Sequence, residues 1–268
     1  MKTVINTLAI AASLLLSGSA MAVATTVVAS DNFEQGNAAG TSVKNSAGGS
    51  GFASGWKTDL STSAPVIIAP GVAMEGANAL QLSTKSNAAA YRDLSSAISG
   101  DVLISFQFQY TGTLGDNDFL GFWFGNSDGP NIGLKANCGG SATCTNDAFV
   151  RTNSTAKMLD NSNLVAGTTY VMFGHLYKTG GSVNYNNFDA WLNPTAAEML
   201  SLTTPDATSK GASTISSFST IGFRTDNLDN NVTVRVDNLQ ISAIPEPTSI
   251  ALFGAALLGM ASLRRRRA

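Results

Sequence analysis

The stretch VLISFQFQYT, at residues 102–111, alternates apolar and polar side chains. Its apolar members fall at every second position: Val102, Ile104, Phe106, Phe108 and Tyr110. A period of two is typical of a β-strand that buries one face and leaves the other in water. The stretch therefore predicts a half-buried strand, and the rest of the chain is interpreted outward from it.

Further strands follow from the same kind of pattern. Residues 119–124 (FLGFWF) form a nearly continuous apolar run, as expected of a central strand. Residues 170–178 and 187–193 predict another adjacent pair. Weaker patterns fit strands at 24–30, 64–69, 79–84, 89–94, 131–136, 147–152 and 214–224.

The last strand has a shift in its pattern. Alternating valines end at Val236, and the apolar positions resume at Leu239 and Ile241. One extra residue in a strand produces such a shift, so we expect a β-bulge near Asn238.

The elements together predict an all-β fold. The only helix expected is at 195–201, where Asn193 caps it and Pro194 opens it. Ten or more short strands without alternating helices indicate a sandwich or barrel, and the lack of a fixed repeat argues against a propeller. The simplest architecture is a jelly-roll β-sandwich of two antiparallel sheets over residues 23–244.

Composition excludes several classes of function. Only 13% of the 268 residues are charged. One histidine and two cysteines are too few for a polynuclear Cys/His metal site. A net charge of −2 does not suit a nucleic-acid binder. Residues 23–244 hold 11 basic and 17 acidic residues, a net charge of −6, which argues against an anionic partner bound by overall charge.

The first 22 residues have the features of a secretory signal peptide. Lys2 is followed by an apolar run at residues 8–16 and by Ala-Met-Ala at 20–22, a small-x-small cleavage site. A permanent membrane anchor is the alternative, but the apolar run is short for a membrane span.

The C-terminal segment, 245–268, combines three features. An uncharged run at 248–263 measures roughly 24 Å as a helix, a marginal transmembrane span for a bilayer core of about 30 Å. Basic residues behind it should stay cytoplasmic. The flanking residues are Pro245, Glu246 and Pro247 before the run, and Arg264, Arg265, Arg266 and Arg267 after it.

Pro-Glu-Pro, a short apolar helix and a terminal arginine cluster resemble the PEP-CTERM sorting signal of Gram-negative bacteria. The resemblance implies export through the secretion machinery and recognition by an exosortase, a membrane-embedded enzyme that cuts near the motif. The chain would be held in the inner membrane in transit and then delivered to the cell surface or extracellular matrix.

The sandwich itself resembles laminin-G-like or concanavalin A-like jelly-roll domains. The similar segments are 170–176 (YVMFGHL), 187–194 (NFDAWLNP) and 234–241 (VRVDNLQI). Hydrolases of the concanavalin A-like class usually carry a Glu-x-Asp-x-x-Glu motif on one strand, and this sequence has none. A secreted polysaccharide hydrolase is therefore the minority interpretation.

Two other catalytic arrangements are also disfavoured. Gly-x-Ser-x-Gly is absent, and His175 lies in strand phase, as a buried or half-buried histidine would. Cys138 and Cys144 enclose a short Gly-rich loop, and an exported chain meets an oxidising compartment, so we expect them to form a disulfide. Redox chemistry is the alternative, without a Cys-x-x-Cys motif to support it.

Calcium is the one cofactor that the sequence suggests. Asp31 ends the first strand and Asp237 lies in the last. Terminal strands of jelly rolls often pair, and calcium takes such oxygen ligands. Ordinary turn chemistry explains each aspartate alone equally well.

Aromatic residues among polar neighbours suggest a sugar site. Trp56 follows a Gly-rich loop and Tyr185 lies among asparagines, whereas Trp123 and Trp191 are expected in the core. Plugging the end of the sandwich is the alternative role for Trp56. The sequence thus predicts a non-catalytic surface or matrix protein with a binding or structural role towards exopolysaccharide. Protein adhesion is a further alternative.

Overall fold

A computed structural model describes residues 25–35, 39–58, 66–70, 74, 76–83, 88–137, 145–154, 157–159 and 162–245. The predicted signal peptide, both cysteines and the sorting residues from Glu246 onward lie outside these ranges. Among the described helices, none has the length and apolar content that a membrane span requires.

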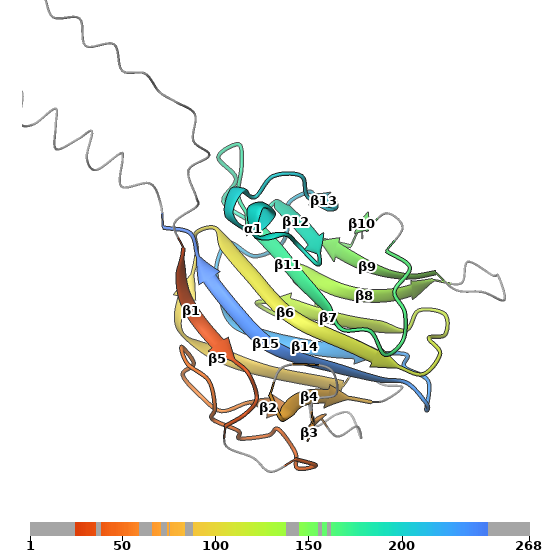
Figure 1. Cartoon of the computed structure of the whole chain (residues 1–268). Helices are drawn as coiled ribbons and strands as arrows, with labels where there is room; N and C mark the ends of the chain where they lie inside the picture. Colours follow the sequence, from red (N-terminus) through yellow and green to blue (C-terminus); the bar gives the residue numbers. More distant parts are fainter. Residues whose placement is uncertain are drawn as a thin grey trace, which may run out of the picture.

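The described residues form two antiparallel sheets (Figure 1). The eight-stranded sheet has the order β13 (Ala207–Lys210), β12 (Asn187–Leu192), β11 (Tyr170–Tyr177), β6 (Val102–Thr111), β15 (Thr233–Ala243), β4 (Asn78–Leu82) and β3 (Val66–Pro70), with β1 (Thr26–Asp31) also paired to β15. The seven-stranded sheet has the order β10 (Lys157–Met158), β9 (Thr145–Arg151), β8 (Asn131–Asn137), β7 (Phe119–Phe124), β14 (Phe218–Asp226), β5 (Ala88–Ile98) and β2 (Lys57–Thr58).

The chain crosses repeatedly between the two sheets, from β4 to β5, from β5 to β6 and from β6 to β7. This is the jelly-roll sandwich that the sequence predicts. The strand at 102–111 is β6, which lies inside its sheet between β11 and β15. The expected pairing of 170–178 with 187–193 is confirmed as β11 with β12.

Aromatic rings fill the space between the sheets. Phe106 of β6 contacts Phe122 of β7 and Phe223 of β14, with ring centroids 5.8 Å and 5.3 Å apart. The Phe106–Phe223 pair meets edge to face, a favoured geometry for aromatic pairs. Alternate residues of β6 therefore face the core, and the residues between them face outward.

The bulge in β15 is confirmed. The register of β15 against β6 shifts between Asp237 and Gln240, and Asn238 has φ +49°. Asparagine tolerates this left-handed backbone better than most residues. The shift lets Leu239 and Ile241 enter the core while Asn238 and Gln240 face outward.

The helix α1 (Ala196–Ser201) is present, but the predicted cap is wrong. Thr195 is the N-cap, because its hydroxyl accepts the Glu198 N–H while the Glu198 carboxylate accepts the Thr195 N–H. This reciprocal capping box satisfies two backbone donors at once. Asn193 instead accepts the Val171 N–H at 2.8 Å.

Candidate functional site

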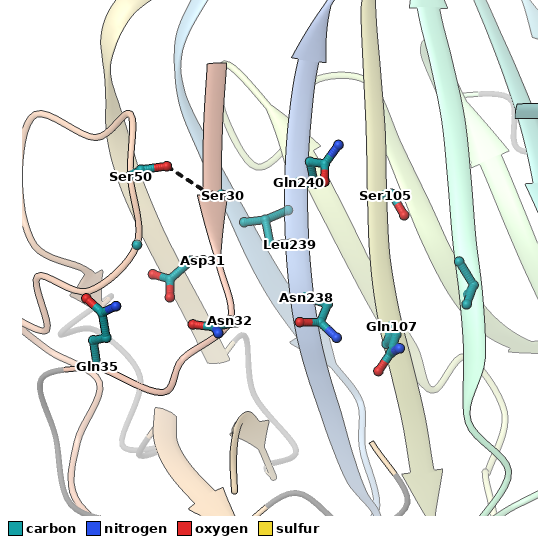
Figure 2. Close-up of a pocket in the computed structure, with 12 residues that line it drawn as sticks. Ser30, Asp31, Asn32, Gln35, Ser50, Ser105, Gln107, Asn238, Leu239 and Gln240 are labelled. Carbon is teal, nitrogen blue, oxygen red and sulfur yellow. Dashed lines mark hydrogen bonds between the residues drawn. The ribbon is translucent and has the colours of Figure 1, made fainter. Parts of the chain in front are cut away.

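A polar groove of about 610 Å³ lies on the outer face of the eight-stranded sheet. It crosses β1, β15, β6 and β11 (Figure 2). Eight of the described residues that line it carry amide or hydroxyl side chains: Ser30, Asn32, Gln35, Ser50, Ser105, Gln107, Asn238 and Gln240.

Two features of the sequence place these side chains outside. The alternation of β6 turns Ser105 and Gln107 outward, because Ile104 and Phe106 are the core residues. The bulge of β15 adds Asn238 beside Gln107, which is paired with Asp237. Figure 2 shows Asn32 across from these two amides, at the end of β1.

Gln107 has an unmet hydrogen-bonding requirement. Its Oε1 is buried and accepts no hydrogen bond from the residues that the structure describes. Leaving a buried acceptor unsatisfied costs about 1–3 kcal/mol, so the site favours an occupant that carries a donor. Water or a ligand hydroxyl in the groove would supply that donor.

Among the described residues that line the groove, Asp31 is the one carboxylate, and it has other partners. Asp31 is 2% exposed, and its oxygens accept hydrogen bonds from the Phe33 N–H at 2.9 Å and the Trp56 indole N–H at 2.8 Å. It also forms an ion pair at 2.8 Å with Arg92, which is 3% exposed. Asp31 therefore belongs to a buried structural cluster beneath the groove.

Arg92 connects this cluster to the loop that covers it. Besides Asp31, its guanidinium donates to the carbonyls of Gly48 and Ser54. The Phe52 ring lies 4.0 Å from the guanidinium carbon. Burial lowers the pKa of Arg92, and the charge of Asp31 opposes that shift.

The two aromatic residues proposed as sugar platforms are buried, so that interpretation needs correction. Trp56 is 0% exposed, because the Gly-rich loop folds inward and places its indole against Asp31 and Arg92. Tyr185 is also 0% exposed and donates its hydroxyl to the Gly100 carbonyl at 2.8 Å. Neither ring presents a face to a ligand.

The proposed calcium ligands lie on paired strands. As expected, β1 pairs with β15, with Asp31 opposite Leu239. Asp237 is buried, and its Oδ1 accepts the Asn238 N–H at 2.7 Å. A calcium ion at Asp31 would have to displace Arg92. Among the described residues, no three His, Cys, Asp or Glu side chains cluster as a metal site requires.

His175 is half-buried, as the sequence predicts. Its ring stacks on Tyr177 with centroids 4.3 Å apart, and its Nε2 lies 3.7 Å from Asp101 Oδ2. Trp123 and Trp191 are both buried, but on outer faces of the two sheets rather than in the main core.

Sequence reasoning did not single out the groove residues Gln107 and Gln240. The outward polar positions of 102–111 were a usable signal for Gln107, since they follow directly from the alternation. No local pattern showed that β1 and β15 would add asparagine and glutamine beside them.

Comparison with known protein families shows what kind of segment the C-terminal end of the chain is. Residues 243–267 match the family described as the PEP-CTERM protein-sorting motif. The chain therefore carries a PEP-CTERM sorting signal, which implies an exported protein that an exosortase processes and that is anchored in the membrane in transit. No curated protein sequence matches the chain.

Solved structures that are similar to this chain include three of low sequence identity. The T. cruzi calreticulin globular domain is 12% identical, with a TM-score of 0.49 over 89% of this chain and 100% of that one. The cellulose induced protein Cip1 is 17% identical, with a TM-score of 0.48 over 79% of this chain and 95% of that one. The CBM22-1 xylan-binding domain of Paenibacillus barcinonensis Xyn10C is 13% identical, with a TM-score of 0.39 over 84% of this chain and 99% of that one.

Proposed function

We propose that this exported protein binds polysaccharide at the cell surface, in the polar groove of the eight-stranded sheet and without cleaving it. The observation that carries the proposal is the row of outward amides around Gln107. Each amide offers both donors and an acceptor, which matches the donor and acceptor character of sugar hydroxyls. Oε1 of Gln107 has no donor among the described residues, so a rotation of this side chain towards the groove would offer it to one such hydroxyl.

The charge of the groove favours a neutral polymer. Lysine and arginine are absent from its described lining, and Asp31 is neutralised by Arg92. Hydrogen bonding rather than charge pairing would therefore select the ligand. The apolar side chain of Val171 provides contact area between the amides.

The same lining supports a non-catalytic role. Glycoside hydrolysis usually uses two carboxyl groups, one as acid and one as base or nucleophile. Among the described residues of the groove, Asp31 is the single carboxylate, and Arg92, Trp56 and Phe33 occupy it.

Binding to a panel of neutral polysaccharides, including the producer's own matrix, tests the proposal. We expect saturable binding without release of sugar, and roughly tenfold weaker binding for Gln107→Ala. Asn238→Gly should also weaken binding, because glycine keeps the bulge and removes the amide.

Gln81→Ala is the matched control, since Gln81 lies on β4 of the same sheet and outside the groove. Release of sugar would instead indicate a hydrolase. Absence of binding to every polymer would favour a protein-adhesive role.

Calcium binding through Asp31 and Asp237 stays a prediction. A structural calcium should raise the melting temperature in millimolar Ca²⁺ and lower it in chelator. A melting temperature that is the same under both conditions would refute it.

A further inference from the structure

The outer face of the seven-stranded sheet carries a second, different surface. Phe119 and Trp123 of β7 and Phe149 of β9 lie outside the main core, yet they are only 7%, 5% and 0% exposed. Neighbouring side chains therefore cover most of each ring.

Two glycines make room for the rings. A Cβ atom on Gly121 would lie 2.5 Å from Phe119 Cζ, and one on Gly222 would lie 2.5 Å from Trp123 Cζ2. No side chain larger than hydrogen fits beneath either ring without moving it. The sheet thus provides a flat floor on which Phe119 and Trp123 rest.

Two arginines lie over this floor. The guanidinium of Arg224 is 5.1 Å from the Phe119 centroid, and that of Arg151 is 5.8 Å from the same ring and 5.9 Å from Phe149. Burial lowers the pKa of Arg151, and the nearby charge of Arg224 lowers it further. The two cations are therefore close enough to repel each other.

Two hydrogen-bond donors on this surface lack an acceptor within the part of the chain that the structure describes. Arg151 donates from Nε to Asn131 at 2.8 Å. Buried donors at Arg224 Nε and Trp123 Nε1 find no acceptor among the residues that the structure describes. Neither arginine forms an ion pair within those residues. The two guanidinium groups lie over the same Phe119 ring, and adjacent like charges are stabilised by an anion between them.

We propose that Arg151 and Arg224, supported on Phe119 and Phe149 and beside the Trp123 indole, form a second binding site that takes the anionic groups of an acidic polysaccharide. Guanidinium groups bind carboxylate and sulfate through paired hydrogen bonds, and stacking on aromatic rings fixes their orientation. The groove of the eight-stranded sheet is not needed for this binding.

The charges around the site make the attraction local. Burial lowers the pKa of Arg151, and the negative charge of Asp128 opposes that shift. Asp226 lies two residues beyond Arg224 on the same strand. Asp93 is paired with Lys57. Residues 23–244 are negative overall, so long-range attraction of a polyanion is excluded. At physiological ionic strength, charges interact over about 8 Å, which leaves contact with the two arginines as the source of affinity.

The test measures binding of the full-length protein to polygalacturonate, dextran sulfate and uncharged dextran. We expect saturable binding to at least one charged polymer, weakened by added salt, and no comparable binding to dextran at this site. Arg224→Gln and Arg151→Gln should each weaken it roughly tenfold. The polymer that binds assigns the anion as carboxylate or sulfate.

Two further variants make the result specific. Arg235→Gln removes the same charge from β15 of the other sheet and should leave binding unchanged, as should Gln107→Ala in the groove. Where a glutamine variant unfolds, the lysine variant keeps the charge, loses the paired hydrogen bonds and should bind more weakly than wild type.

Three results would overturn the proposal: no binding to either charged polymer, unchanged binding by the Arg151→Gln/Arg224→Gln double variant, or an equal loss in Arg235→Gln. Loss of neutral-polymer binding in Gln107→Ala concerns the groove alone, so the two proposals fail separately.

Discussion

At the scale of single residues, the ion pair of Asp31 and Arg92 joins the two sheets. Asp31 ends β1 of one sheet, and Arg92 points inward from β5 of the other. The Asp31 carboxylate accepts hydrogen bonds from the buried Phe33 and Trp56. The Arg92 guanidinium donates to the carbonyls of Gly48 and Ser54, in the loop that covers the pair. The pair thus fixes the loop that forms one wall of the groove.

Removing one member should therefore be costly. Arg92→Met leaves the Asp31 carboxylate buried without its cation, and breaking such a pair typically costs about 3–5 kcal/mol. Urea unfolding measures the change. Arg235→Met, at a half-buried arginine of β15, is the control and should cost much less. A loss below about 1 kcal/mol for Arg92→Met would show that the loop does not depend on the pair.

Tyr177 gives the folded protein a dependence on alkaline pH. Burial, and then the charge of Asp189, raise its pKa from 10.0 to about 12. The unfolded chain releases this proton near pH 10 while the folded chain retains it, so stability falls as pH rises between these values. Melting temperatures from pH 9 to 12 should fall less steeply for Tyr177→Phe. Parallel curves for the two proteins would contradict this assignment.

Residue exposure was the least predictable property. Trp56 follows four small residues and a phenylalanine, so the sequence suggested an exposed tip. Its burial depends on Arg92, which lies 36 positions away along the chain. A charged residue in phase with Ala90 and Leu94 signals that Arg92 needs a buried partner, but nothing local identifies Asp31 as that partner.

At the scale of elements, alternation predicted most strands because burial of one face depends only on spacing along the strand. It placed β6 correctly and located the bulge in β15, and the continuous apolar run at 119–124 placed β7. The predicted pair at 170–178 and 187–193 is β11 and β12. The two-residue strands β2 and β10 and the four-residue β13 are too short to show a period, so they were missed. Their position depends on pairing with β5, β9 and β12, which are distant or separate segments that no local pattern identifies.

The bulge in β15 sets which side chains reach the groove. With φ +49° at Asn238, a β-branched residue is strained, whereas glycine is not. Asn238→Val should lower the free energy of unfolding by roughly 1–2 kcal/mol. Asn238→Gly should stay within about 1 kcal/mol of wild type. Equal stability of the two variants in urea unfolding would mean that the bulge relaxes at no cost.

At the scale of the whole molecule, the first and last strands of the sandwich lie side by side. Thr26 at the start of β1 is paired with Ala243 at the end of β15 (Figure 1). The sorting motif begins at residue 243, so it starts where the last strand ends. The sorting motif therefore begins at the same end of the sandwich as the start of β1.

Sorting should depend on the motif and not on the sandwich. Replacing Glu246 and the four arginines at 264–267 removes the charged features of the signal while leaving every described strand intact. We expect this variant to accumulate as an unprocessed precursor in the membrane fraction, because the exosortase no longer recognises it. An immunoblot of cell fractions measures both size and location. Glu198→Gln is the control, because it removes a carboxylate in α1 and leaves the motif unchanged. This variant should mature normally. Normal maturation and placement of the motif variant would mean that residues outside these five direct the sorting.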